Sequence, residues 1–569
     1  MRFIAFAGVV IVVVLALFTY PGATAISMVI HLTPTLAPSG SPPQGTLPWL
    51  HVEHPAHGRP YISDDQGRLI LLHGATPASL IDLGSSANNP TSDMPTHYPI
   101  DPAAYANGQC PQNSSQSRYP PLCQSDIDAM AAMGFNSIRL PVSWSLLEPR
   151  RGEFSQTYLD RVAQVVEWAG SAGLYVIIDM HQNAYSKFVG AGPGVDLTYN
   201  SGAPQWATNT DGLPSRVFQS KRELNAAVFQ AFTNFWYDRA GIQDEYIKTI
   251  AFIASRFKDN STVAGYSLFN EPQPGWSLPP GYEDLLLFPF YRRVIDAITG
   301  AGDGLPCWTG FFMPASCGYP DLGVHDQRHL VFLETGLMRE ITDSPTHLGL
   351  PVSSYPNVVL SIHGYTHIYT LDQLLFKENP ENANYPWGGF DQSYSTADSE
   401  ARAMNVALFV AEFGDDPKED AFEVTNQLLE QEKHGVGSAF WTWKENGNPG
   451  WGVYDPPPAG STASSGCLRP ARERLLARVY PAASADPSAD FHYDPTTGAF
   501  TMSAAGAQGG PPTVITIPHE VTGAVSSHGA VSIQVGPGPH GGRTVIGTPS
   551  GGDYTISVAA APLTLSSCP

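Results

Sequence analysis

Two glutamates in this sequence end apolar runs, and as a pair they have the groups needed for acid–base and nucleophilic chemistry. Glu271 closes the stretch Ser-Leu-Phe-Asn-Glu-Pro, and Glu412 lies in Phe-Val-Ala-Glu-Phe-Gly. Cleavage of a glycosidic bond uses one protonated carboxyl to donate to the leaving oxygen and one carboxylate to attack the sugar or activate water. A separation of about 5 Å gives retention of configuration and ~6.5–9.5 Å gives inversion. We therefore predict that Glu271 and Glu412 are catalytic.

Further polar and aromatic residues lie within or just after apolar runs: Arg139, His181, Asn183, Asn270, His363, Tyr365, Trp441 and Trp443. The two tryptophans are two positions apart, so on a strand they share a face, and we expect one ring to stack on a sugar. Either tryptophan could instead fill the barrel interior. Glu334, His367 and Tyr369 also end or follow apolar runs, but the sequence assigns them no role.

The elements that carry these residues alternate between strands and helices. Eight runs are nearly all apolar, as expected of strands buried on both faces: 69–72, 137–142, 175–180, 265–269, 330–333, 358–362, 407–411 and 437–443. Helical patterns occupy 125–133, 155–172, 225–257, 282–298 and 399–405. This order predicts an α/β fold, a (β/α)8 barrel over residues 59–480, with its active site at the carboxyl ends of the strands. A doubly wound open sheet is the alternative, and it is disfavoured because no G-x-G-x-x-G follows a strand.

The two ends of the chain differ in composition from the barrel region. Residues 1–25 combine Arg2, an apolar run and Ala-Thr-Ala, which predicts a secretory signal peptide, with a retained membrane anchor as the alternative. Residues 26–58 are rich in Pro, Ser and Thr and are interpreted as a linker. After Pro481, short strand-like segments separated by Gly and Pro predict a small β-sandwich over residues 481–569. We expect the protein to be secreted or associated with the cell surface.

Composition excludes several function classes. The 569 residues include 30 Lys and Arg against 52 Asp and Glu, a net charge of −22, so the chain would repel a nucleic acid backbone. The six cysteines form no metal-binding cluster, and an exported chain favours disulfides. Proximity favours the pairs Cys110–Cys123 and Cys307–Cys317, which leaves Cys467–Cys568, although free or otherwise paired thiols are an alternative. We expect no metal or other cofactor, and a monomer.

The motif Asn270-Glu271-Pro272 on the fourth predicted strand and Glu412-Phe413-Gly414 on the seventh resemble the clan A glycoside hydrolases, and the wider residue set resembles glycoside hydrolase family five. That resemblance implies a retaining (β/α)8 enzyme with Glu271 as acid/base and Glu412 as nucleophile. It also implies a set of candidate substrate-binding residues: Arg139, His181, Asn183, Asn270, His363, Tyr365, Trp441 and Trp443. Within that set it places Asn270 on the sugar 2-hydroxyl, Arg139 and Tyr365 on the nucleophile, His363 on the acid/base and His181 near the sugar.

A finer resemblance points to the endoglycoceramidase branch of that family. It rests on Met180-His181-Gln182-Asn183-Ala184-Tyr185-Ser186 and on the insertion that follows, including 202–208 and 210–214. Enzymes of this branch cut the β-bond between a glycan and ceramide. Asn183 replaces the branch's common Asp, and the loop 74–99 has no Lys where several members have one, so the sugar headgroup is left open. An apolar groove would be lined by Trp206, Phe218, Phe229, Phe232, Phe235 and Trp236, but Phe229, Phe232 and Trp236 also fit the core face of a helix.

The sequence therefore predicts a secreted retaining β-glycosidase whose partner is a glycolipid or glycan substrate, with transient contact to a membrane surface through that substrate. The alternatives within enzymes are a polysaccharide endo-hydrolase such as a cellulase or mannanase, and a β-glucosidase or transglycosylase acting on simple lipid glycosides. The alternative outside enzymes is a lectin-like glycan binder, which the pair Glu271 and Glu412 disfavours.

Overall fold

The structure is a computed structural model of the full chain. It describes residues 45–566 except 84–98, 112–117, 191–196, 198, 219–220, 278–281, 303–305, 309–313, 317, 338, 340–344, 346–353, 366–388, 447–449 and 456–465. All of these described residues belong to one compact unit, Leu36–Pro569. In this part of the chain no helix is long and apolar enough to cross a membrane.

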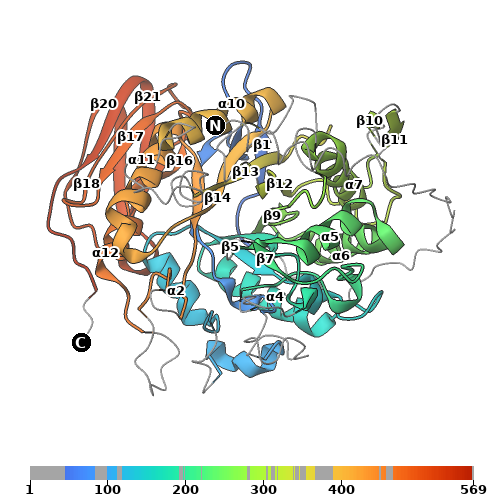
Figure 1. The fold of residues 1–569 in the computed structure, drawn as a ribbon. Coiled ribbons are helices and arrows are strands. Elements are labelled where there is room, and N and C mark those ends of the chain that lie inside the picture. The colour runs from blue at the N-terminus through green and yellow to red at the C-terminus, as the bar shows by residue number, and fades with distance from the viewer. Residues whose placement is uncertain are drawn as a thin grey trace, which may run out of the picture. The chain divides into compact units, whose positions relative to one another are not determined.

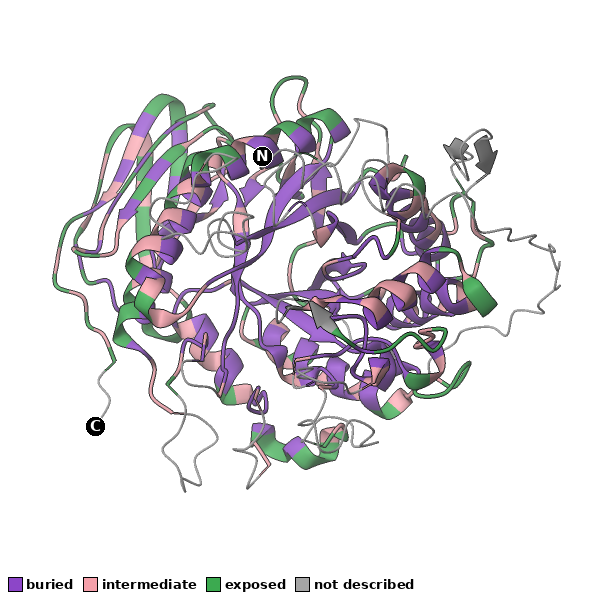
Figure 2. Ribbon diagram, viewed as in Figure 1, coloured by how far each residue is buried: buried purple, intermediate pink, exposed green. Residues whose placement is uncertain are grey.

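A closed barrel of eight parallel strands forms within the described residues and confirms the predicted fold class (Figure 1). Its strands, in barrel order, are β4 (His73–Ala75), β5 (Ser137–Val142), β6 (Tyr175–Met180), β9 (Val263–Ser267), β12 (Leu330–Glu334), β13 (Val358–Gly364), β14 (Ala407–Phe413) and β15 (Gly437–Phe440). Nearly every residue in them is buried (Figure 2), because helices cover the outside and side chains fill the inside.

Helices between the strands pack their apolar residues into the main core. The principal ones are α2 (Gln124–Ala132), α4 (Gln156–Ser171), α5 (Ala226–Trp236), α6 (Ile242–Phe257), α7 (Phe288–Thr299), α10 (Phe390–Met404), α11 (Thr425–His434) and α12 (Pro470–Leu476). Helix α4 begins where the side chain of Ser155 accepts a hydrogen bond from the Tyr158 amide. Its buried residues Leu159, Val162 and Val166 recur at helical spacing and pack into the main core.

An antiparallel β-domain contains nine described strands and combines both ends of the described chain. They are β1 (Leu50–Glu53), β2 (Tyr61–Asp64), β3 (Leu69–Ile70), β16 (Tyr480–Ser484), β17 (Asp490–Asp494), β18 (Ala499–Gly506), β19 (Thr513–Ile517), β20 (Val525–Pro537) and β21 (Arg543–Val558). The first half of β21 pairs with β19 and the second half with β18. Strand β1 was expected to be linker, and its pairing with β2 places it in this sheet.

The run 69–72 was predicted to be the first barrel strand, and this was wrong. Residues Leu69 and Ile70 form β3, which pairs with β16 of the β-domain, and the barrel strand begins at His73. The physical reason is that the run serves two cores. Leu69 and Leu71 pack in the β-domain, while Ile70 and Leu72 pack in the barrel interior. Apolar content alone does not show which of these two hydrophobic cores a residue of the run enters.

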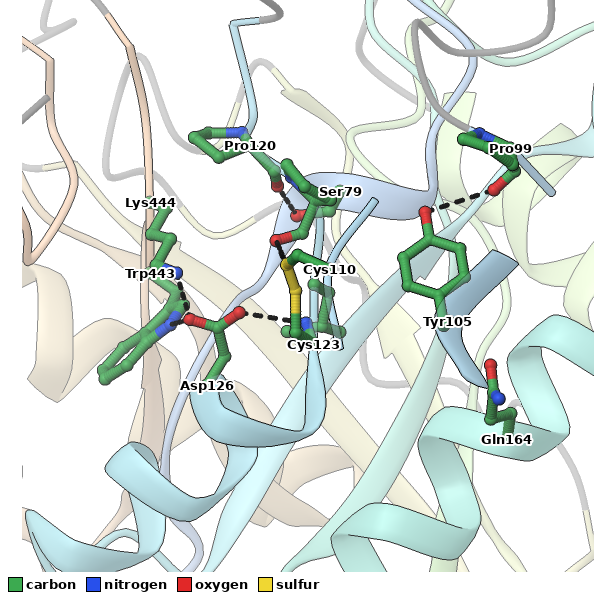
Figure 3. Close-up of a disulfide and its surroundings, with 12 residues drawn as sticks. Ser79, Pro99, Tyr105, Cys110, Pro120, Cys123, Asp126, Gln164, Trp443 and Lys444 are labelled. Atoms are coloured by element: carbon green, nitrogen blue, oxygen red, sulfur yellow. Dashed lines mark hydrogen bonds and ion pairs between the residues drawn. A yellow bond between two sulfur atoms is a disulfide. The ribbon is translucent and has the colours of Figure 1, made fainter. Parts of the chain in front are cut away.

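The predicted disulfide between Cys110 and Cys123 is present, and Figure 3 shows it at the start of helix α2. Beside it, the carboxylate of Asp126 accepts a hydrogen bond from the Cys123 amide at 2.9 Å. Cys467 is also disulfide-bonded. Its predicted partner, Cys568, and the side chains of the predicted pair Cys307–Cys317 lie outside the described part of the chain.

Candidate active site

The barrel brings Glu271 and Glu412 together at the carboxyl ends of its strands. Glu271 follows β9, and Glu412 lies near the end of β14. One carboxylate oxygen of each, together with a ring nitrogen of His363, lies within 4.8 Å of the others. The side chain of Glu412 is 5% exposed and that of Glu271 is 17% exposed. The two groups are therefore close enough to act on one bound bond.

Two hydrogen-bond donors hold the carboxylate of Glu412. The guanidinium of Arg139, on β5, lies 2.5 Å from Glu412 Oε1. The hydroxyl of Tyr365, just after β13, donates to Glu412 Oε2 at 2.8 Å. Each oxygen thus has one donor, and the two donors fix the orientation of the carboxylate.

Glu271 is positioned through both its side chain and its backbone. His363 Nδ1, on β13, lies 3.0 Å from Glu271 Oε1. The backbone of Glu271 has φ +44°, in the left-handed region that side-chain-bearing residues rarely adopt. Its amide donates to Glu334 Oε2 at 2.8 Å, and its carbonyl accepts from Gln182 Nε2 at 3.0 Å. These bonds on both sides hold a conformation that the chain would otherwise leave.

The pKa of Glu271 is lowered in this arrangement. Burial opposes ionisation, but the hydrogen bond and the charge of His363 outweigh it. For Glu334, burial again raises the pKa, and the charges of His363 and Arg139 overcome this and bring it from 4.5 to about 2. Glu334 is therefore an ionised carboxylate in the interior of the barrel.

His181 contacts both Asn183 and Trp441 just beyond the carboxyl ends of the third and eighth barrel strands. His181 Nδ1 lies 2.8 Å from Asp179 Oδ2, and Asn183 Nδ2 lies 3.3 Å from His181 Nε2. The ring of Trp441 stacks on His181, with centroids 5.2 Å apart and planes 9° from parallel. Asn270 contacts Arg139 through its side-chain oxygen at 2.7 Å. These contacts connect the third barrel strand with the eighth, and the second with the fourth.

Trp443 does not share the environment of Trp441. Strand β15 ends at Phe440, so the two tryptophans follow the strand and no longer alternate as strand residues do. The Trp443 side chain is buried, its indole donates to Asp126 at 3.1 Å (Figure 3), and its ring packs on Tyr454. The expectation that both rings share a face is corrected, and Trp443 belongs to the core.

The structure also reveals site residues that the sequence did not assign. Glu334 contacts Arg139, His363 and the Glu271 backbone, and the signal available in the sequence was only its place at a strand end. Away from these contacts, the buried Lys187 lies 2.7 Å from Asp82, which belongs to the loop after the first barrel strand; that loop contains no lysine. His367 and Tyr369 lie outside the described residues.

The aromatic residues expected to line a groove are mostly core. Phe232, Phe235 and Trp236 are buried on α5, and they pack on Phe269 and Phe290. For Phe232 and Trp236 the structure favours the alternative that their helical spacing marks the core face of a helix. Phe229 is half-buried, and its ring contacts that of Trp276, with centroids 5.2 Å apart. The side chain of Phe218 lies outside the described part of the chain.

Comparison with known proteins agrees with this geometry. A model of the family described as Cellulase (glycosyl hydrolase family 5) matches residues 104–447. Endoglycoceramidase I of Rhodococcus hoagii is 28% identical over 215 residues, which are 38% of this chain and 36% of that protein. An endoglycoceramidase of Cyanea nozakii is 27% identical over 270 residues, 42% of this chain and 50% of that protein. The chain thus spans about a third to a half of the length of these curated relatives.

Among solved structures, a crystal structure of endogalactoceramidase aligns with a TM-score of 0.68 and 26% identity, covering 90% of this chain and 100% of that one. The family match covers more than half of the chain and includes both glutamates. The chain belongs to glycosyl hydrolase family 5.

Proposed function

We propose that this protein is a retaining β-glycosidase that cleaves the bond between a glycan and the lipid of a glycosphingolipid. The observation that carries the mechanism is the spacing of Glu271 and Glu412, whose nearest oxygens lie within 4.8 Å. Retaining enzymes hold their carboxyl groups about 5–5.5 Å apart, whereas inverting enzymes leave room for a water molecule between them.

The proposed reaction has two displacements. In the first, Glu412 attacks the anomeric carbon as Glu271 gives a proton to the departing oxygen, which leaves as the lipid alcohol. In the second, Glu271 takes a proton from water as the water oxygen attacks the anomeric carbon, and the ester bond between that carbon and Glu412 breaks. Arg139 and Tyr365 fix the attacking carboxylate, which keeps it close to its reacting position.

In this proposal the sugar next to the cleaved bond lies between Trp441 and Asn270. Trp441 has a ring already aligned parallel to His181, and an aromatic face suits the apolar side of a sugar ring. The amide of Asn270 donates to the Gln182 carbonyl at 2.9 Å while its oxygen faces Arg139, so its orientation is fixed. A fixed amide supports the proposed contact with the 2-hydroxyl, which strengthens in the transition state.

Support for a lipid aglycone comes from an exposed aromatic patch, Tyr237 and Trp276. Trp276 is 45% exposed and follows Glu271 by one short loop, and Tyr237 is 64% exposed. The Tyr237 hydroxyl lies 3.3 Å from Ser277 Oγ, so the two rings belong to one surface. Gln230 helps to hold the Trp276 ring in place, because its side-chain oxygen accepts a hydrogen bond from the indole at 2.9 Å. Amphipathic aromatic rings of this kind favour a lipid–water boundary, and the names of the relatives above are in accord with a ceramide-linked substrate.

We also propose that the chain is exported through residues 1–25. The disulfide Cys110–Cys123 and the bonded Cys467 support this, because disulfides persist in oxidising compartments. Fractionation of cells that express the full chain, with an antibody to its C-terminal domain, tests the proposal. Recovery of the whole amount in the cytosol would contradict it.

The decisive experiment is product analysis with a mixed panel of glycosphingolipids. We expect intact oligosaccharide and ceramide to be released, with the newly formed sugar first appearing as the β-anomer in proton NMR. Glu412→Gln keeps the shape of the side chain and should reduce turnover by at least ~10⁴-fold. Gln230→Ala serves as a companion, because it disturbs the aromatic patch without touching the two glutamates.

The outcomes separate the parts of the proposal. Cleavage of aryl β-glycosides or β-glucan without ceramide release would refute the lipid substrate and leave the two-glutamate chemistry. First appearance of the α-anomer would refute retention. Glycan binding with no cleavage of any substrate would refute an enzymatic function altogether.

A further inference from the structure

We infer that Glu334, at the end of β12, is a positioning residue that makes His363 the store of the proton that Glu271 delivers to the leaving oxygen. The inference rests on the proposed function, since it concerns the acid step of that reaction. It assigns a task to a buried carboxylate that the two-glutamate mechanism itself does not use.

Glu334 is surrounded by donors among the described residues. Its Oε1 lies 2.7 Å from the Arg139 guanidinium and accepts from the Ser267 hydroxyl at 3.1 Å. Its Oε2 accepts from the Glu271 amide at 2.8 Å and lies 3.2 Å from His363 Nε2. The side chain is 0% exposed, and its backbone carbonyl accepts from the Tyr291 hydroxyl at 2.8 Å. A buried carboxylate with these donors remains ionised and fixed in place.

The contact with Nε2 determines what the other nitrogen of His363 does. An anionic oxygen at 3.2 Å favours a proton on Nε2. Nδ1 then faces Glu271 Oε1 at 3.0 Å and Glu412 Oε2 at 3.6 Å. With Nε2 protonated, a further proton can lie either on Nδ1 or on Glu271, and either form is competent to supply an acid. Without Glu334, the neutral ring can carry its single proton on Nδ1 and donate a hydrogen bond to Glu271. That ring has no second proton that it could transfer to Glu271.

Charges around the imidazole favour the cationic form. The carboxylates that face His363 come from three directions: Glu271 after β9, Glu334 on β12 and Glu412 on β14. The positive charge of Arg139 opposes this effect, but the guanidinium contacts Glu412 and Glu334 Oε1, the Glu334 oxygen that does not contact His363. Burial raises the pKa of Glu271, and the hydrogen bond and charge of His363 outweigh this effect and lower the pKa.

The acid step can be written with every proton placed. As the glycosidic C–O bond breaks, its electron pair stays on the leaving oxygen. The Glu271 O–H bond breaks and a new O–H bond forms on that oxygen. The proton reaches Glu271 from Nδ1 of His363, which becomes neutral and keeps its Nε2 proton against Glu334. After Glu271 removes a proton from water in the second displacement, the same path runs backwards and restores the imidazolium.

The test is the variant Glu334→Gln, which keeps the volume and removes the charge. Wild type and variant are assayed for kcat/KM from pH 4 to 9 on two aryl β-glycosides, one with an activated dinitrophenyl group and one with an unactivated phenyl group. The phenyl glycoside requires the acid, and we expect its kcat/KM to fall about 10²–10⁴-fold. The dinitrophenyl glycoside does not require it and should fall less than about tenfold. The basic limb for the phenyl glycoside should move to lower pH by about 1–3 units.

A matched control is Glu148→Gln. Glu148 is also fully buried and accepts three hydrogen bonds, from the Trp144 indole at 2.9 Å, the Thr249 hydroxyl at 2.8 Å and the Gly152 amide at 2.7 Å, but it contacts neither catalytic glutamate in the described structure. We expect equal effects of this change on both glycosides. Equal losses on both glycosides in Glu334→Gln, with an unmoved basic limb, would overturn the inference and reduce Glu334 to a structural residue.

One further readout, an NMR titration, keeps the test decisive. If Glu334→Gln does not fold, the ring of His363 in the wild type is followed by carbon-13 NMR, with His363→Gln used for assignment. Persistence of the Nε2 proton through the titration supports the inference, and a neutral ring protonated on Nδ1 overturns it. A wild type that cleaves neither glycoside would instead refute the proposed function, while the NMR result would still judge the contact between Glu334 and His363.

Discussion

Replacing Arg139 with methionine would remove the cation around which three buried carboxylates are arranged. The guanidinium lies 2.5 Å from Glu412, 2.7 Å from Glu334 and 3.0 Å from Asp179, and the side chain is 0% exposed. Methionine fills similar space but donates no hydrogen bond. We expect the variant to be destabilised and to lose activity, because the carboxylates remain buried without their partner.

The magnitude follows from the burial of these groups. Removing one member of a buried ion pair costs about 3–5 kcal/mol of the free energy of unfolding. Part of that cost depends on pH. Burial raises the pKa of Glu334, but His363 and Arg139 bring it from 4.5 to about 2, which corresponds to about 3 kcal/mol of stabilisation at neutral pH. Because the folded-state pKa is depressed, this stabilisation is present above pH ~4.5 and is lost as the pH falls toward 2.

Urea denaturation of wild type and Arg139→Met at several pH values measures the total loss in the free energy of unfolding and the part of that loss that depends on pH. The difference in the free energy of unfolding should be about 3–5 kcal/mol at pH 7 and should shrink as the pH falls below ~4.5, because the wild type loses its advantage there. Arg150→Met is the control, since Arg150 is 80% exposed and pairs with Glu153 at the surface, and it should change stability by less than about 1 kcal/mol. A difference below 1 kcal/mol for Arg139→Met, or one that does not vary with pH, would refute the reasoning.

Three other changes have defined outcomes. Tyr365→Phe removes the donor to the nucleophile at 2.8 Å, worth about 1.5–3 kcal/mol, so kcat/KM on an aryl β-glycoside should fall about 10–100-fold with little change in thermal unfolding; an unchanged rate would show that this hydroxyl is dispensable. Lys187→Met should destabilise the protein in urea by about 3–5 kcal/mol, and adding Asp82→Asn should recover part of the loss; additive losses would contradict a coupled pair. Replacing Cys110 and Cys123 by serine opens a loop with a sequence separation of 13 and should cost about 3 kcal/mol, measured against wild type with and without reductant.

Much of the barrel is encoded locally. The predicted runs 137–142 and 175–180 have the same bounds as β5 and β6, because an apolar stretch buried on both faces looks alike in any parallel barrel. The pairing of Cys110 with Cys123 was predictable for a similar reason, since the two residues lie close in the chain. The exception, 69–72, is a run whose alternate residues serve two cores, and only the assembled sheets reveal that.

The sequence by itself determined which residue types end the strands, and therefore that Glu271 and Glu412 meet at one end of a barrel. The tertiary structure alone decided how far apart their oxygens lie and which neighbours control them. Glu334 acquires its place from contacts with β5, β9 and β13, and Trp441 and Trp443 diverge because the chain leaves the strand after Phe440. The physical reason is range: apolar patterning acts along a segment, whereas hydrogen bonds and ion pairs at a strand end depend on segments far apart in the chain that only folding brings within about 3 Å.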